Sequence, residues 1–136
     1  PAKVNDRLQL GEHGTTFGGG PVTCAVASYV YDLLTDPAFL SVVRERGEQL
    51  QQGLESLRVR HNLGPVVGAG MLCGVHVPGA TDGLSKIQAL SSSLPSAGVL
   101  ALRSGDDVLR IAPPLVISAE DLSDGIQRID TALGEL

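Results

Sequence analysis

Apolar residues at helical spacing predict two helices near the start of the chain. Pro21 suits the first position of a helix, and the apolar residues after it predict a helix over 21–34. Asp36 is a favourable N-cap before Pro37 and begins a second helix. One face of this second helix is apolar and consists of Leu40, Val43, Leu50, Leu54 and Leu57. The opposite face is expected to be solvated and carries Arg44, Glu45, Arg46, Glu48, Gln49, Gln51 and Gln52.

After residue 60 the pattern changes to short apolar runs interrupted by glycine. Two strands are predicted, at 66–69 and 72–77. The period of two in the second strand places three residues on one face: Cys73, Val75 and Val77. A helix over about 82–96 follows, and Pro95 must end it.

The last third of the chain predicts a hairpin and a closing helix. The runs "GVLAL" (98–102) and "DVLRI" (107–111) read as two strands joined by the polar turn 104–106. Ser118 and Asp121 resemble a capping box at the start of the final helix. Its apolar positions are Leu122, Ile126, Ile129, Leu133 and Leu136. The order of elements predicts an α+β fold, in which helices cover one face of a small antiparallel sheet.

Composition narrows the functional classes. The chain has 136 residues, 43% of them hydrophobic, and a net charge of −5, so it is long enough for one folded core and lacks the basic surface that binds nucleic acid. It shows no signal peptide and no apolar run long enough for a membrane span. Cys24 and Cys73 have no CxxC spacing, which indicates a reducing, cytoplasmic compartment and two small buried apolar side chains. The start at Pro1 without Met favours a fragment or processed product.

The segment "GEHGTTFGGGP" (11–21) is the first candidate site. Glycines allow close approach of the backbone, Thr15 and Thr16 offer hydroxyl groups, and a helix N-terminus favours negative charge. These features predict a phosphate-binding loop. The spacing matches neither of the standard glycine-rich phosphate motifs, so a purely structural loop is the alternative.

Arg110 is the second candidate. Strand alternation over 108–111 places Arg110 and Val108 on one face, with Leu109 and Ile111 on the other. A rigidly held guanidinium suits two-pronged recognition of a carboxylate. The alternative is an ordinary surface or ion-paired arginine.

The other polar residues give weaker signals. His76 is interpreted as an exposed strand residue and His61 as a cation at a helix C-terminus. No His, Cys or carboxylate group has metal-ligand spacing, so no metal site is expected. Lys3 and Lys86 lie in no apolar setting that would suit covalent chemistry.

Two separated segments carry a family resemblance. "GEHGTTFGGGP" joined to "VTCAVASYVYDLL", and "DDVLRIAPPLVISAEDLSDGIQRIDTAL", resemble the C-terminal part of class III pyridoxal-phosphate-dependent aminotransferases. The likeness is greatest to the acetylornithine type, followed by the ornithine type. It implies a segment of the large domain at 1–20 and the C-terminal small domain of a fold-type I enzyme at 21–136.

The resemblance also implies an activity and its site residues. Such enzymes are homodimers that use pyridoxal 5′-phosphate to exchange an amino group between an amino acid, here N-acetylornithine of arginine biosynthesis, and 2-oxoglutarate. Thr16, with Thr15 beside it, would bind the phosphate of the partner subunit's cofactor. Arg110 would bind a substrate carboxylate.

Two departures from the family pattern qualify this expectation. Gly20 replaces the usual Asn before Pro, which would loosen the start of the following helix. No segment matches the Schiff-base lysine, so the chain alone is expected to be inactive and not to hold the cofactor. The alternatives are a free-standing small-molecule binding or interaction domain with the same fold, and a related class III enzyme acting on another amine such as 4-aminobutyrate or succinylornithine.

Overall fold

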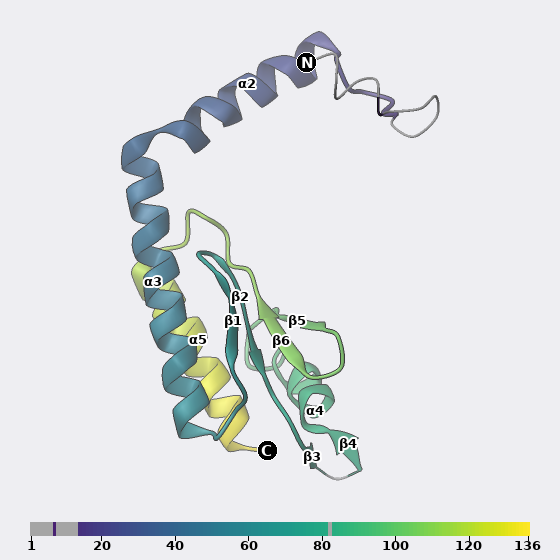
Figure 1. The fold of residues 1–136 in the computed structure, drawn as a ribbon, viewed down its shortest axis with the longest axis vertical. Helices are drawn as coiled ribbons and strands as arrows, with labels where there is room; N and C mark the ends of the chain where they lie inside the picture. Colours follow the sequence, from purple (N-terminus) through teal and green to yellow (C-terminus); the bar gives the residue numbers. More distant parts are fainter. Residues whose placement is uncertain (1–6, 8–13, 82) are drawn as a thin grey trace. The chain divides into compact units, whose positions relative to one another are not determined.

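The computed structural model describes residues 7, 14–81 and 83–136 (Figure 1). Its internal contacts divide the chain into two compact units, Pro1–Leu40 and Ser41–Leu136. Each unit is described separately. The predicted division after residue 20 concerns a longer enzyme and stays a prediction.

The first unit contains helix α2 and the start of helix α3. α2 spans Pro21–Thr35 and α3 spans Pro37–Arg60, close to the two predicted helices. The Asp36 carboxylate accepts hydrogen bonds from the backbone N–H groups of Ala38, at 2.7 Å, and Phe39, at 3.1 Å. Asp36 therefore is the N-cap that the sequence indicates.

The second unit is built on a four-stranded antiparallel sheet. Its strand order is β1-β2-β6-β5, with bounds Val66–Ala69, Leu72–His76, Val108–Ile111 and Leu102–Ser104. The register places Val75 beside Leu109, and both are fully buried. The predicted face of β2 is therefore the core face.

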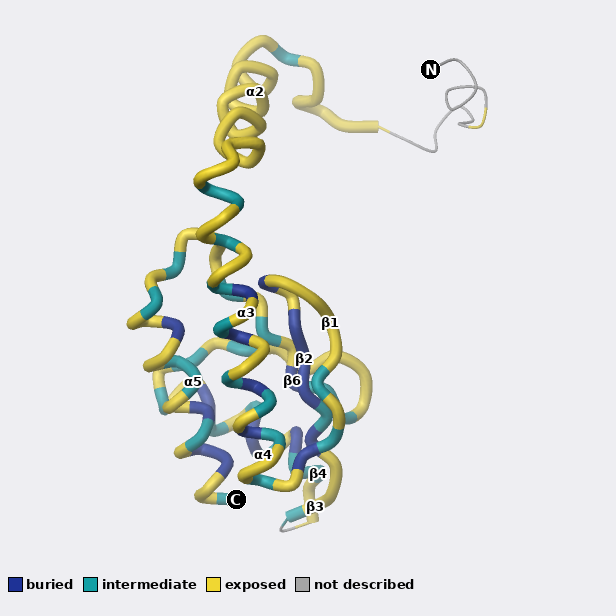
Figure 2. Tube along the Cα trace, turned by 60° about the vertical axis from the view of Figure 1, so that its left-hand side comes forward, coloured by how far each residue is buried: buried dark blue, intermediate teal, exposed yellow. Residues whose placement is uncertain are grey.

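Helices cover that face of the sheet. α3, α4 (Lys86–Ser93) and α5 (Ala119–Gly134) contribute to one cluster of buried apolar side chains with β2 and β6. Figure 2 shows the buried positions of α3, α5 and the sheet turned toward this common interior. The predicted α+β fold, with helices on one face of a small antiparallel sheet, is confirmed.

Local capping signals place the starts of α4 and α5. The Ser118 hydroxyl accepts from the Asp121 N–H at 2.9 Å, so the capping interaction expected before α5 forms. Ser85 and Gln88 form a capping box that starts α4. The predicted helix over 82–96 was therefore too long, because its first residues belong to a short hairpin of β3 (Ala80–Thr81) and β4 (Leu84–Ser85).

The predicted first strand of the second hairpin was also misplaced. β5 begins at Leu102 rather than at residue 98. The N–H groups of Gly98 and Val99 donate to the carbonyls of Pro95 and Leu94, so this backbone closes the end of α4 and is not free for a strand ladder.

Two side chains lie in surroundings that the sequence did not indicate. The Gln49 amide, expected in solvent, donates to the Ala119 carbonyl and the Ser123 hydroxyl, each at 2.9 Å, and so joins α3 to α5. Cys24, expected to be buried, is exposed on α2. Cys73 is buried in the core, as predicted.

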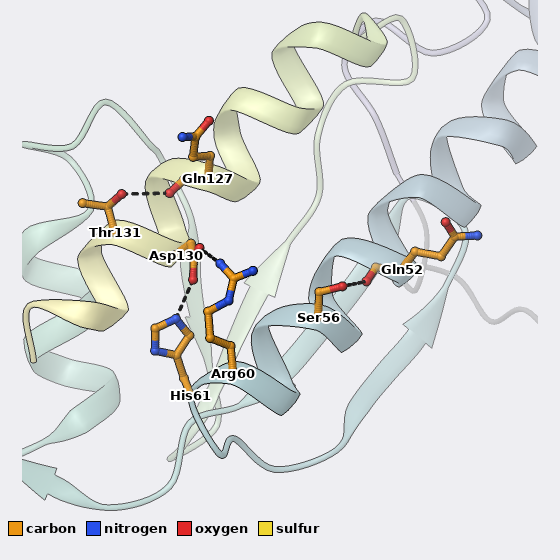
Figure 3. A network of polar contacts seen from close by, with 7 residues as sticks. All are labelled: Gln52, Ser56, Arg60, His61, Gln127, Asp130 and Thr131. Carbon is orange, nitrogen blue, oxygen red and sulfur yellow. Dashed lines mark hydrogen bonds and ion pairs between the residues drawn. The ribbon is translucent and has the colours of Figure 1, made fainter.

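A polar network also joins the end of α3 to α5 (Figure 3). Asp130 of α5 accepts from Arg60 and lies 2.6 Å from the His61 Nε2 atom. From the sequence, His61 was interpreted as a cation that complements the dipole at the helix C-terminus. Its main described partner is instead a carboxylate on another helix, a contact that depends on tertiary packing.

Candidate functional site

The loop before α2 forms a shallow hollow with exposed hydroxyl groups. Thr15 and Thr16 are both exposed. Residues 16–23 line a hollow of about 430 Å³ at the start of α2. Thr16 lies in this lining, whereas Thr15 lies outside it, so the two threonines do not have equivalent positions.

Glycine at position 18 fixes the shape of the loop. A Cβ atom built on Gly18 would lie 2.0 Å from the Thr15 Cγ2 atom, so the Thr15 methyl group packs against the bare backbone there. Gly19 follows with φ of +81°, a conformation that favours glycine. Thr15 therefore contributes to loop shape, while Thr16 is one of the residues that line the hollow.

The start of α2 leaves backbone donors available beside Thr16. Gly20 is the N-cap and has no side chain to accept from the first turn, and Pro21 has no N–H. In the described structure the N–H groups of Val22 and Thr23 have no partner. A phosphate group fits this set of two amides, one hydroxyl and a positive helix end.

Arg110 lies on the face of the sheet opposite the helices. Leu109 is buried in the core, and Arg110 is exposed on the other face, as strand alternation predicts. The register places Gly74 and Leu102 on either side of Arg110. Among the described residues, no carboxylate forms an ion pair with the Arg110 guanidinium, so its hydrogen-bond donors are available to a ligand.

The surroundings of Arg110 are apolar and sterically constrained. A Cβ atom on Gly74 would lie 2.7 Å from the Val108 Cγ1 atom and 3.2 Å from the Leu109 carbonyl oxygen, so this position beside Arg110 requires glycine. The same face exposes Val67, Leu72 and Leu102. A planar guanidinium group held on a strand is suited to bind a carboxylate, because its two prongs can donate parallel charge-assisted hydrogen bonds.

A histidine–aspartate pair on this sheet was not found from the sequence. The His76 Nδ1 atom lies 3.1 Å from an Asp107 carboxylate oxygen, and His76 alternates onto the same face as Gly74. His76 is half-buried rather than exposed. Alternation along β2 indicates from the sequence which face His76 occupies. That Asp107 lies next to it follows only from the register between β2 and β6, which the sequence does not specify.

The remaining candidate residues give little support for a reactive or metal-binding role. Burial raises the pKa of the Cys73 thiol, which lowers its reactivity. The described residues contain no cluster of three or more His, Cys, Asp or Glu side chains that could hold a metal ion. Within the same residues, no helix has the length and apolar character needed to cross a membrane. Lys3 and His13 lie outside the described residues.

Comparison with known protein families gives a match over nearly the whole chain. The sequence model of the family described as "Aminotransferase class-III" matches residues 1–133. The chain is 38% identical over 134 residues to acetylornithine aminotransferase of Neisseria meningitidis, covering 98% of this chain and 33% of the relative. It is 39% identical over 130 residues to succinylornithine transaminase of Yersinia enterocolitica, covering 93% and 30%.

Solved structures show the same likeness. Acetylornithine aminotransferase of Elizabethkingia anophelis superposes with a TM-score of 0.78 at 30% identity, covering 98% of this chain and 35% of that chain. Ornithine aminotransferase of Toxoplasma gondii gives a TM-score of 0.75 at 30% identity, covering 97% and 31%. The chain thus spans about a third of the length of the relatives it matches.

Proposed function

The chain belongs to the class III aminotransferase family, and from that premise we propose that it supplies two ligand anchors to an enzyme that transaminates N-acylated ornithine. Thr16 is the anchor for the phosphate of pyridoxal 5′-phosphate, and Arg110 is the anchor for a substrate carboxylate. The observation that carries this proposal is that both groups are exposed and have unsatisfied donors around them: the two α2 amides beside Thr16, and the unpaired guanidinium of Arg110 among the described residues.

The work of this chain in the reaction is binding and orientation. Pyridoxal phosphate, when bound, supplies the electron-withdrawing chemistry of amino transfer, and the protein positions its reactive atom. The Thr16 hydroxyl and the amides of Val22 and Thr23 would hold the phosphate at the start of α2. Arg110 would hold a carboxylate in a fixed plane, because both guanidinium prongs can donate to it.

The finer identity of the enzyme is proposed from its relatives. N-acetylornithine is the proposed amino donor and 2-oxoglutarate the acceptor, which would place the reaction in arginine biosynthesis. Succinylornithine is the second candidate donor, because a succinylornithine transaminase is as similar to the chain as the acetylornithine enzyme is. In the working enzyme, a homodimer, Thr16 would serve the cofactor of the partner subunit.

The catalytic lysine is proposed to lie outside this chain. The chain has two lysines. Lys86 starts α4 in the second unit and lies in neither of the two proposed anchors. Lys3 lies outside the described residues, and its sequence context does not match that of the family's Schiff-base lysine. We therefore expect the 136-residue chain by itself to give no transamination.

The test uses protein expressed from the full reading frame. Purified enzyme should transaminate N-acetylornithine with 2-oxoglutarate, and the ratio of kcat/KM for acetylornithine and succinylornithine assigns the donor. The isolated chain serves as the comparison and should show no turnover. Turnover by the isolated chain, or no reaction of the full protein with either acylornithine, would refute the proposal. A start codon immediately before Pro1 would instead support a free-standing binding domain.

A further inference from the structure

We propose that Thr23 is the positioning residue of the phosphate-binding loop; this inference rests on the proposed role of Thr16. The Thr23 Oγ1 atom lies 2.8 Å from the Phe17 carbonyl oxygen and 2.9 Å from the Gly20 carbonyl oxygen. A single hydroxyl group on the first turn of α2 thus reaches both ends of the turn that carries the loop into the helix.

The hydrogen bond to the Phe17 carbonyl distinguishes Thr23 from other threonines in helices. A threonine hydroxyl commonly bonds to a carbonyl three or four residues earlier in its own helix, as the bond to Gly20 illustrates. Phe17 is six residues earlier and lies before the helix. Its carbonyl group belongs to the Phe17–Gly18 peptide, one residue after Thr16, so this bond ties the loop backbone next to Thr16 to α2.

The same geometry keeps the backbone donors of α2 available. The Phe17 carbonyl also accepts from the Gly20 N–H at 3.3 Å, which closes the turn. The single O–H group of Thr23 stabilises this turn by donating to the Phe17 or the Gly20 carbonyl, or by being shared between the two. Gly20 has no side chain that could cover the amides. The loop is therefore fixed without use of the Val22 and Thr23 N–H groups that a phosphate would need. The expectation that Gly20 loosens the start of α2 did not include this hydrogen bond from Thr23 to the Phe17 carbonyl.

Thr35 at the other end of α2 provides a matched control. Its hydroxyl oxygen also lies within hydrogen-bond distance of two carbonyl oxygens, 2.9 Å from that of Tyr31 and 3.3 Å from that of Asp32, but both belong to the helix. Thr23 and Thr35 are exposed on the same helix. Valine at either position removes the hydroxyl group at nearly constant shape, so the two substitutions differ only in what the lost bond held.

The experiment compares binding of pyridoxal phosphate and of pyridoxal, which lacks the phosphate, to the full-length protein. The ratio of the two affinities reports contacts to the phosphate, and general damage affects both ligands. Thr23→Val should lower this ratio about three- to ten-fold, the effect of one lost hydrogen bond. Thr23→Ser, which keeps the hydroxyl group, and Thr35→Val should retain the wild-type ratio.

Hydrogen exchange in the cofactor-free protein provides a second readout. A peptide covering the loop and the first turn of α2 should exchange faster in Thr23→Val and at the wild-type rate in Thr23→Ser and Thr35→Val. An unchanged rate and an affinity ratio within about two-fold of wild type in Thr23→Val would overturn the role of Thr23. Thr16→Val separates the two proposals: if it leaves the ratio unchanged, the phosphate site itself is wrong, whereas a lowered ratio in Thr16→Val alone would reject only the positioning role.

Discussion

Substitution of Arg110 should impair substrate use without affecting the fold. Arg110 is exposed, and among the described residues no carboxylate pairs with it, so its removal breaks no contact that holds the chain together. Exposed positions of this kind change the free energy of unfolding by no more than about 0.5 kcal/mol. Arg110→Gln in the full-length enzyme should therefore unfold at nearly the wild-type urea concentration.

The catalytic effect should be much larger than the effect on stability. Loss of a charge-assisted contact to a carboxylate costs about 1.5–3 kcal/mol, which corresponds to a fall of about 10- to 150-fold in kcat/KM. Arg110→Lys keeps the charge but loses the planar fork, so its kcat/KM should lie between those of wild type and Arg110→Gln. The assay is steady-state transamination with each substrate varied in turn.

Arg103 is the matched control for this experiment. It lies on the neighbouring strand β5, and its register with Leu109 places it on the opposite face from Arg110. Both arginines are exposed, so Arg103→Gln makes the same change of charge within the same hairpin. Equal losses of kcat/KM in Arg103→Gln and Arg110→Gln would refute carboxylate recognition by Arg110, as would wild-type kinetics of Arg110→Gln.

Four further predictions concern the packed core, the polar network of Asp130 and the two cysteines. Leu54→Ala, at a core position with 0% exposure, should lower the free energy of unfolding in urea by about 2–5 kcal/mol, and a loss below 1 kcal/mol would contradict the described packing. Asp130→Ala should cost about 1–2 kcal/mol in the same assay because it removes the partner of Arg60 and His61; no loss would show that the network is not formed. A thiol reagent should label Cys24 in the folded chain and Cys73 only on unfolding. Because burial raises the folded pKa of Cys73, its stability contribution is full below the ordinary thiol pKa and is lost as the pH rises through the raised value; a titration with increasing stability over that range would contradict this.

Local sequence signals predicted most of the fold. The caps at Asp36 and Ser118 depend on residues three positions away at most, and both starts were placed correctly. Alternation along β2 and β6 predicted the core face and the exposed face of Arg110. The β3–β4 hairpin was missed because strands of two residues are too short to show a period.

Sequence analysis failed for side chains whose surroundings are determined by tertiary contacts. Gln49 has the sequence character of a solvated residue, and only the packing of α3 on α5 shows its role. The candidate anchors at Thr16 and Arg110 followed from composition, alternation and family resemblance. The different positions of Thr15 and Thr16, and the bond from Thr23 to Phe17, depend on the loop conformation, which no repeat in the sequence specifies.

A crystal structure of the full-length enzyme with pyridoxal phosphate and a substrate carboxylate would test the central claim most directly. The account predicts the Thr16 hydroxyl within about 2.6–3.2 Å of a phosphate oxygen at the start of α2, and the Arg110 guanidinium in two parallel hydrogen bonds with the carboxylate. A phosphate held entirely by other residues, with Thr16 in solvent and Arg110 away from the substrate, would contradict it.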